Sequence, residues 1–363
     1  MGDGTSPKHV PQARLHQKND QKFYQLSIVL HNYLRMAQFV CDFPYHKNQL
    51  PSIHNMFTKL QQYAEACRKQ SPQKVLGERL ALIQRSYPED FNSTDSISDH
   101  FTEPARMLAV QGRKKSPMET WLSWSASFKK SKTPEQLRDE LYFKSGMVNG
   151  FNPCIAIYAF LTLSKGEELR VLDPCMGWGD RLIASCAVNA KEYVGFDTNP
   201  DLIEPHEKII DMLATKMITD TIYKPFELTP SEWYESGGRY CEHFDFVLTS
   251  PPFWTVEIYN GTETSTTLYK TEKEWYNKFY AVFLDKCSKA IKKGGHLCLY
   301  ISPQMESFTK KHFSGSVGSV GSVVSDAKEG LEYIGTIGFY QTTGTKFVDE
   351  RKVRNLYVWR RKY

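Results

Sequence analysis

The stretch R-V-L-D-P-C-M-G-W-G-D-R-L-I-A-S-C-A-V, residues 170–188, decides the fold of this 363-residue chain. Its first residues, Arg170 to Leu172, form a short apolar run typical of a buried strand that ends at Asp173. Residues Arg181 to Val188 have helical character. A strand that passes into a helix through a glycine-bearing loop is typical of a parallel α/β sheet. We therefore expect a ligand-binding loop at the carboxyl end of this strand.

The remaining C-terminal sequence repeats this alternation of strand and helix. It predicts strands at Tyr193 to Phe196, near Ile222, at Phe244 to Leu248 and at His296 to Ile301, and helices over Leu202 to Leu213 and from about Thr271 to the glycines at 294 and 295. Two last strands, Tyr333 to Tyr340 and Leu356 to Trp359, are expected to form an antiparallel hairpin at the sheet edge. The fold class predicted is α/β, with a largely parallel, Rossmann-like sheet covered on both faces.

The sequence before this region differs in character. Apolar residues recur at helical spacing from Lys22 to Lys69, and residues 74–87 and 117–142 also have helical character. We predict a disordered lead-in over residues 1–20, a mainly helical domain over 21–145, and the α/β domain over 146–363, with the boundary at the Gly- and Pro-bearing stretch Gly146 to Pro153. Ser314 to Ser325, with its G-S-V repeat, is interpreted as a flexible insertion.

Composition indicates a soluble globular protein, since 40% of residues are hydrophobic and 24% are charged. The longest apolar run, Cys154 to Leu163, is about half the ~20 residues that a membrane-spanning helix needs, so no membrane association is expected. The N-terminus lacks an apolar signal segment. The eight cysteines contain no C-x-x-C pair, and we interpret them as reduced thiols in an intracellular compartment. No His/Cys spacing resembles a zinc site, so no metal is predicted.

Charge is unevenly distributed along the chain. Residues 1–150 hold 21 Lys and Arg against 14 Asp and Glu, a net +7, whereas residues 151–363 hold 25 against 27, a net −2. The basic residues Arg113, Lys114, Lys115, Lys129 and Lys130 stand on either side of Trp121, Trp124 and Phe128. This mixture suits phosphates and stacked bases and predicts a nucleic-acid partner. The alternative is a solvated basic helix face above core tryptophans.

The loop Asp173-Pro174-Cys175-Met176-Gly177-Trp178-Gly179 is the candidate cofactor site. Glycine lets a backbone approach a ligand closely because no Cβ intervenes. The second strand ends in Asp197, where a carboxylate is placed to accept hydrogen bonds from ribose hydroxyls. The dinucleotide fingerprint G-x-G-x-x-G fails, because Leu182 stands where the third glycine is required. A plain strand-to-helix turn is the alternative for this loop taken by itself.

The fourth strand runs into Ser250-Pro251-Pro252-Phe253, which matches the D/N/S-P-P-Y/F/W motif of amino-methyltransferases. Together with the loop at 173–179, it resembles the class I DNA N4-cytosine and N6-adenine methyltransferase family, whose members use S-adenosylmethionine. The resemblance covers roughly residues 145–363 and includes Phe151-Asn152-Pro153, placed like the element that precedes the cofactor loop in one group. It implies a class I methyltransferase sheet.

The resemblance also implies residue roles. Ser250 and the Pro251 carbonyl would accept the two N–H groups of a target amine, Pro252 would stiffen the turn, and Phe253, with Trp254 as a second candidate, would stack on the target ring. For the cofactor, Asp173, Pro174, Gly177 and Gly179 would hold the methionine part, Asp197 the ribose, and Phe226 would border the adenine, unless Phe226 is a core residue.

The chain departs from the family pattern next to the first loop. Trp178 occupies a position that usually carries a small residue, Asp180 is expected to cap the following helix, and Arg181 is interpreted as surface charge.

Several substrates and functions remain open at this stage. Serine in the first motif position favours cytosine N4 over adenine N6, and the resemblance to the DNA methyltransferase family favours DNA over RNA. The alternatives are RNA adenosine N6-methylation, protein-glutamine methylation, which a related Asn-headed motif serves, and a non-catalytic nucleic-acid-binding subunit. The intact set Asp173, Asp197 and Ser250 favours an enzyme over such a subunit. Residues 255–270, rich in Thr and Tyr, are a candidate mobile loop over the substrate, and a structural tail is the alternative.

Overall fold

The computed structural model describes residues 43, 50–69, 79–83, 96–109, 114–148, 150–164, 168–214, 216–254, 263–314, 330–340 and 353–362. The chain divides into two units, Met1–Tyr45 and His46–Tyr363, and nearly all described residues belong to the second. The predicted lead-in, Arg113, residues 255–262 and nearly all of the G-S-V insertion lie outside the described residues. Within these ranges, no helix combines the length and the apolar character needed to cross a membrane.

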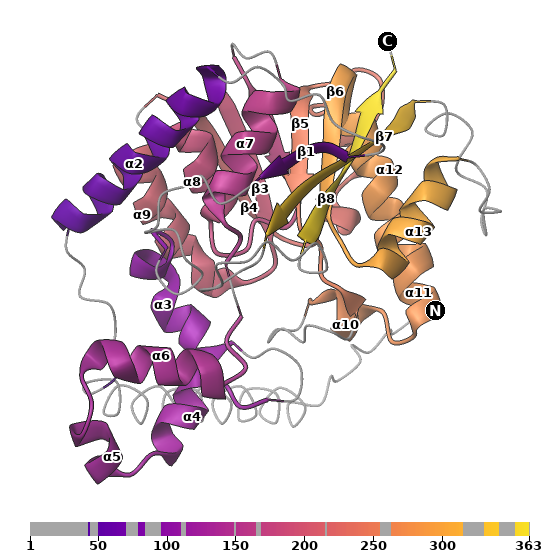
Figure 1. Ribbon diagram of the computed structural model, residues 1–363. Helices are drawn as coiled ribbons and strands as arrows, with labels where there is room; N and C mark the ends of the chain where they lie inside the picture. The colour runs from indigo at the N-terminus through magenta and orange to yellow at the C-terminus, as the bar shows by residue number, and fades with distance from the viewer. Residues whose placement is uncertain are drawn as a thin grey trace, which may run out of the picture. The chain divides into compact units, whose positions relative to one another are not determined.

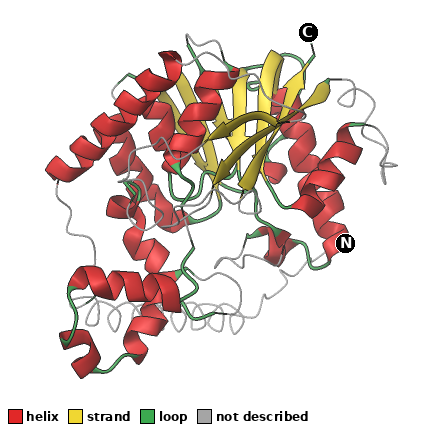
Figure 2. Ribbon diagram, in the orientation of Figure 1, coloured by secondary structure: helices red, strands yellow, loops and turns green. Residues whose placement is uncertain are grey.

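A single sheet of eight strands, in the order β1-β7-β8-β6-β5-β2-β3-β4, organises the second unit (Figures 1 and 2). The strands β2 to β6 pair in parallel, and β8 runs antiparallel between β6 and β7. Their bounds are Arg79–Ile83 (β1), Arg170–Asp173 (β2), Glu192–Asp197 (β3), Ile218–Tyr223 (β4), Phe244–Thr249 (β5), Ile291–Tyr300 (β6), Leu331–Tyr340 (β7) and Val353–Arg361 (β8). This arrangement confirms the predicted α/β, Rossmann-like fold class.

The far edge of the sheet differs from the prediction. The antiparallel pairing of β7 with β8 is confirmed, but β8 lies inside the sheet and β1 adds to β7 in parallel, so the hairpin is not the edge. The helical character predicted for residues 74–87 is therefore wrong at Arg79–Ile83. Gly294 and Gly295 do not end a helix either: they lie inside β6, which follows directly after the helix ending at Ala290.

Two hydrophobic clusters cover the two faces of the sheet. On one face α2 (Leu50–Lys69), α7 (Pro153–Leu163), α8 (Asp180–Ala187) and α9 (Ile203–Leu213) share a cluster with Val171, Phe246 and Leu248. On the other, α12 (Ala281–Ala290), which continues α11 (Glu272–Glu274) through a π-helical turn at Trp275–Tyr280, and α13 (Pro303–Phe313) pack on Leu172, Val247 and Leu297. Alternate strand residues thus point to opposite faces, as the pleat requires, and Figure 1 shows the two helix groups on either side.

Four further helices, α3 (Asp99–Leu108), α4 (Pro117–Ser123), α5 (Ala126–Lys130) and α6 (Pro134–Lys144), precede α7. Capping boxes begin α4 at Ser116, with Glu119, and α6 at Thr133, with Gln136, and each has proline at its first turn. These helices agree with the helical flank predicted by the sequence. By contrast, α2 and β1, which come from the same predicted domain, belong to the sheet and its core. That α3 to α6 form a domain of their own, which ends near residue 146, stays a prediction.

Candidate active site

The two motif loops lie next to each other at the carboxyl edge of the sheet. Strands β2 and β5 are parallel neighbours with Leu172 opposite Val247, so the loops that follow them leave the sheet side by side. The backbone N–H of Cys175 donates to Thr249 Oγ1 at 3.2 Å, which ties the first loop to the residue before Ser250. This edge of the sheet is where open α/β folds bind their ligands.

Asp173, at the end of β2, is fully buried and held by an ion pair. Its Oδ2 accepts from Arg181 Nε at 2.7 Å and from the Tyr193 hydroxyl at 2.9 Å. Arg181 also donates to the Cys175 carbonyl and is only 4% exposed, so its interpretation as surface charge is wrong. The other carboxylate oxygen, Oδ1, is buried without a hydrogen-bond partner among the described residues. Asp173 therefore combines a structural contact with a spare buried acceptor. Pro174, which follows it, is also buried.

Gly177 and Gly179 adopt left-handed backbone conformations, with φ of +53° and +89°. A side chain on Gly179 would approach His206 and Ile209, whereas no atom lies within 4 Å of a Cβ built on Gly177. The N–H of Gly177 donates to Asp197 Oδ2 at 2.8 Å. The first loop thus has open space above Gly177 and needs glycine at both positions.

Asp197 ends β3 and faces this loop, as the sequence predicts. Besides Gly177, it accepts from the Asn199 N–H at 2.9 Å. Burial raises the pKa of Asp197 to about 6, with the backbone donors acting in the opposite direction. The group is an anion at neutral pH, with lone pairs left for a ligand.

His206 on α9 supports the loop, and sequence reasoning missed it. Its Nε2 lies 2.9 Å from the Gly177 carbonyl and its Nδ1 3.0 Å from the Tyr223 hydroxyl. Burial lowers the pKa of His206 to about 4, so the ring is neutral. Because a carbonyl only accepts, Nε2 carries the proton and Nδ1 accepts from Tyr223. The signal in the sequence is its helical spacing with the buried Ile209 and Leu213.

Three carboxylates surround Cys175 in the first loop. Burial raises the pKa of its thiol well above the usual value, and the charges of Asp197, Asp173 and Glu227 raise it further. Glu227 accepts from the Tyr269 hydroxyl at 3.1 Å, and its own carbonyl accepts from Lys286 Nζ at 2.6 Å. These carboxylates place negative charge around Cys175, which the charge of Arg181 offsets in part. Such a setting suits a cationic ligand.

Phe226, which the resemblance places beside the cofactor, belongs to the core. It is 2% exposed, and its ring lies 5.1 to 5.6 Å from those of Phe196, Phe283 and Tyr234 in edge-on contacts. The structure thus assigns it the packing role that the sequence left as the alternative.

The second loop presents polar and aromatic groups together. Pro251 is buried, while Ser250, Pro252 and Phe253 are partly exposed. Ser250 Oγ makes no hydrogen bond with any described residue. The Phe253 ring contacts Tyr300, at the end of β6, edge-on at 6.0 Å. Tyr300 is a neighbour of the site that sequence reasoning missed.

Trp254 has a left-handed backbone, with φ of +49°. Such a conformation is unusual for a bulky residue and marks a functional site more often than a random position. Its ring packs against Trp275, 6.0 Å away. It is only partly buried, which leaves part of the ring accessible.

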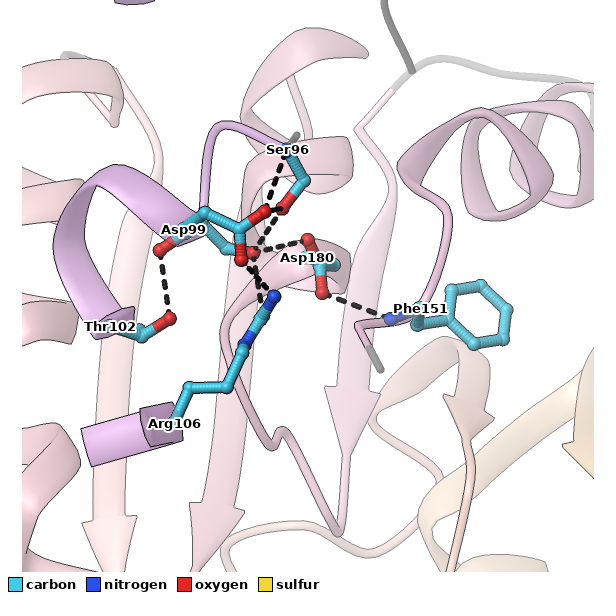
Figure 3. A network of polar contacts seen from close by, with 7 residues as sticks. Ser96, Asp99, Thr102, Arg106, Phe151 and Asp180 are labelled. Carbon is cyan, nitrogen blue, oxygen red and sulfur yellow. Dashed lines mark hydrogen bonds and ion pairs between the residues drawn. The ribbon is translucent and has the colours of Figure 1, made fainter. Parts of the chain in front are cut away.

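Trp178 and Asp180 contact α3 and the residue that begins it. The Trp178 indole packs with Val148 and Leu202 and lies under the guanidinium of Arg106. The prediction that Asp180 caps α8 is wrong, because the N-cap is Gly179. The Asp180 carboxylate instead accepts from Ser98 Oγ at 2.7 Å and from the Phe151 N–H at 3.0 Å (Figure 3).

The basic side chains predicted to contact nucleic acid lie on and before α4 to α6. Lys114, Lys115 and Lys130 are exposed. Lys129 Nζ lies 4.0 Å above the centroid of the buried Trp121 ring, and Trp121 contacts Trp124 edge-on. The segment therefore has solvated lysines next to a buried tryptophan. These features fit both a nucleic-acid contact surface and a solvated basic face above core tryptophans.

No protein-family model matches the chain, and no curated protein matches it. Solved structures with a similar fold include TrmN from Thermus thermophilus (13% identity, 58% of this chain, TM-score 0.36), a putative RNA methyltransferase from Pyrococcus horikoshii (14%, 58%, 0.36) and a SAM-dependent O-methyltransferase from Thermotoga maritima (12%, 59%, 0.36). The matched regions cover 49%, 83% and 66% of those chains, so the match spans about half of TrmN. At these identities the likeness concerns the fold alone.

Proposed function

We propose that this protein is an S-adenosylmethionine-dependent methyltransferase that modifies an exocyclic amino nitrogen of a base in nucleic acid, with cytosine N4 of DNA as the first target to test. One observation carries the proposal: Ser250-Pro251-Pro252-Phe253 leaves β5 directly beside the glycine loop of β2. The Ser250 hydroxyl, which has no hydrogen-bond partner among the described residues, and the Phe253 ring thereby lie beside the loop that carries Asp173 and Gly177.

The residues at the pocket fit the expected cofactor, S-adenosylmethionine. The buried Oδ1 of Asp173 lacks a donor, which the ammonium of the methionine part would supply. The carboxylate of Asp197 would accept from the ribose, and the space above Gly177 admits a ligand against the backbone. When bound, this cofactor supplies a methyl group on a sulfonium that is already a good leaving group.

The chain's own residues would prepare the target amine. The lone pair of an exocyclic amine is delocalised into the ring, which makes the nitrogen a poor nucleophile. Ser250 Oγ and the Pro251 carbonyl would each accept one N–H and hold the nitrogen with its lone pair directed towards the pocket. Phe253 would hold the base by stacking. Positioning and preorganised acceptors are the main contributions expected from such a site.

The lysines on and before α4 to α6 support nucleic acid as the substrate. A base in a duplex must be extruded before its amine is reachable, at a cost of a few kcal/mol, which requires contacts to the backbone. Exposed Lys114, Lys115 and Lys130 provide the positive charge for phosphates. This assignment is independent of the target base.

The test is methyl transfer from radiolabelled S-adenosylmethionine to separate DNA, RNA and glutamine-peptide substrates, followed by mass spectrometry of the nucleosides. We expect label in DNA as N4-methylcytosine, and its loss in Ser250→Ala. Label in RNA alone would replace DNA as the substrate, and label in the peptide alone would remove the nucleic-acid proposal. Absence of cofactor binding in calorimetry would instead favour a non-catalytic subunit.

A further inference from the structure

Helix α3 contacts the glycine loop through side chains whose roles the proposed function leaves open. Trp178 stands between the two left-handed glycines of the loop. The guanidinium carbon of Arg106, on α3, lies 5.1 Å from the centroid of its ring. Arg106 is 3% exposed, and Trp178 is 9% exposed. A planar guanidinium stacks well on an indole, and the attraction is stronger when the pair is desolvated.

The same arginine lies in a buried polar network that reaches the end of the loop. It donates to Asp99 and, at 3.3 Å, to Ser98 Oγ, and Ser98 Oγ donates to Asp180 at 2.7 Å. Asp180 in turn accepts from the Phe151 N–H, so the network joins α3 to the start of α8 and to the segment before α7 (Figure 3).

The network leaves no room for a larger residue beside it. A Cβ built on Gly150 would lie 2.5 Å from Asp180 Oδ2 and 3.2 Å from an Arg106 nitrogen. Arg106 Nε is buried without a hydrogen-bond partner among the described residues. The guanidinium is therefore held by its bonds to Asp99 and Ser98 and by the cation–π contact with Trp178.

Two sets of contacts therefore hold the loop. Asp197 and His206 bond the backbone of Gly177. Arg106 contacts the side chain of Trp178, the residue that departs from the small residue usual at this position. Because Gly177 and Gly179 have wide backbone freedom, a loop without this anchor would have to be ordered when the ligand binds.

We propose that Arg106 is a positioning residue that orders the cofactor loop through Trp178, and so determines cofactor affinity without touching the cofactor. The inference rests on the proposed function for the identity of the ligand. It explains why a large aromatic residue stands between the two glycines.

The test compares cofactor affinity in Arg106→Lys, Trp178→Leu, Trp178→Phe and the double variant Arg106→Lys/Trp178→Leu. Calorimetry with S-adenosylhomocysteine, turnover and thermal unfolding are measured on the whole chain. We expect each of the first two variants to weaken binding about tenfold, which corresponds to about 1.4 kcal/mol. Arg106→Lys, which lies outside the loop, should keep turnover at saturating cofactor close to wild type. Trp178→Phe should restore most of the affinity, and the double variant should lose less than the product of the two single losses.

Arg239→Lys is the matched control. Arg239 also lies over an aromatic ring, 4.9 Å from the Tyr240 centroid, and pairs with Asp220, but away from the loop. The Arg239→Lys variant should bind the cofactor with wild-type affinity. The proposal is overturned if folded Arg106→Lys and Trp178→Leu bind the ligand as the wild type does, or if affinity falls only in parallel with thermal stability. If Trp178→Leu does not fold, Arg106→Lys decides between these outcomes. A wild-type chain that binds no ligand would remove the proposed function instead.

Discussion

Replacing Asp173 by asparagine should lower the free energy of unfolding, independently of any effect on catalysis. Asp173 is fully buried, and its Oδ2 holds both Arg181 and Tyr193. The variant leaves the Arg181 guanidinium, 4% exposed, without the carboxylate of its ion pair, although the charge of Asp180 still acts on it. Removing one member of a buried ion pair costs about 3–5 kcal/mol. The asparagine oxygen still accepts one hydrogen bond, so we expect a loss of about 3 kcal/mol, a large part of the ~5–15 kcal/mol typical of a folded protein.

The assay is thermal unfolding followed by circular dichroism. For a domain of about 150–250 residues, each kcal/mol lowers the melting temperature by roughly 2–4 °C, so we expect a fall of about 6–12 °C. The lower value applies to a larger domain, because the shift per kcal/mol decreases with size. The double variant Asp173→Asn/Arg181→Met removes both charges while the asparagine still accepts from Tyr193. It should recover most of the loss, because a buried pair replaced by uncharged groups is often neutral in stability.

This double variant also distinguishes the structural role of Asp173 from its role in ligand binding. If Oδ1 of Asp173 holds the cofactor, the stabilised double variant still binds S-adenosylhomocysteine poorly, because the anionic acceptor is absent. An Asp173→Asn chain that unfolds at the wild-type temperature would refute the structural role of the pair. A double variant with wild-type cofactor affinity would refute the ligand role of Oδ1.

Three further outcomes are expected. Ser250→Ala should lower turnover by at least about tenfold with cofactor affinity nearly unchanged, as calorimetry and initial rates will show. Because burial raises the pKa of Asp197 to about 6, this carboxylate gains a proton as pH falls through that value, and cofactor affinity should drop below pH 6 in wild type but not in Asp197→Asn. Lys129→Gln/Lys130→Gln should weaken oligonucleotide binding and reduce its salt-dependence slope by about 2 if each lysine meets one phosphate, with cofactor affinity as the control.

The fold could be predicted where local pattern decides it. The short apolar runs before Asp173, Asp197 and Ser250 are strands, and their carboxyl ends meet at one edge because the sheet is parallel there. The edge strand β1 could not be predicted in the same way. Its five residues, R-L-A-L-I, fit a helix or a strand equally well, and its partner β7 lies about 250 residues further along the chain.

The candidate site shows the same division between local and distant causes. Gly177 and Gly179 were identifiable because the turn requires positive φ. The burial of Arg181 could not be predicted, because an arginine in the first turn of a helix is ordinarily solvated. It is buried here because it forms an ion pair with Asp173, at the end of the preceding strand. His206 gave only a weak signal, its place on the apolar face of α9.

The contacts of Trp178 connect these observations. The Trp178 side chain, between two left-handed glycines, is buried against Val148, Leu202 and residues of α3. The segment before α7 is tied to the same place, since Asp180 holds the Phe151 N–H and Gly150 leaves room for the network. Because α3 and α7 come from opposite ends of the lysine-bearing helices α4 to α6, both ends of that segment are anchored at the cofactor loop. A nucleic acid bound to those lysines would therefore act on a segment whose attachment points also contact the candidate cofactor loop.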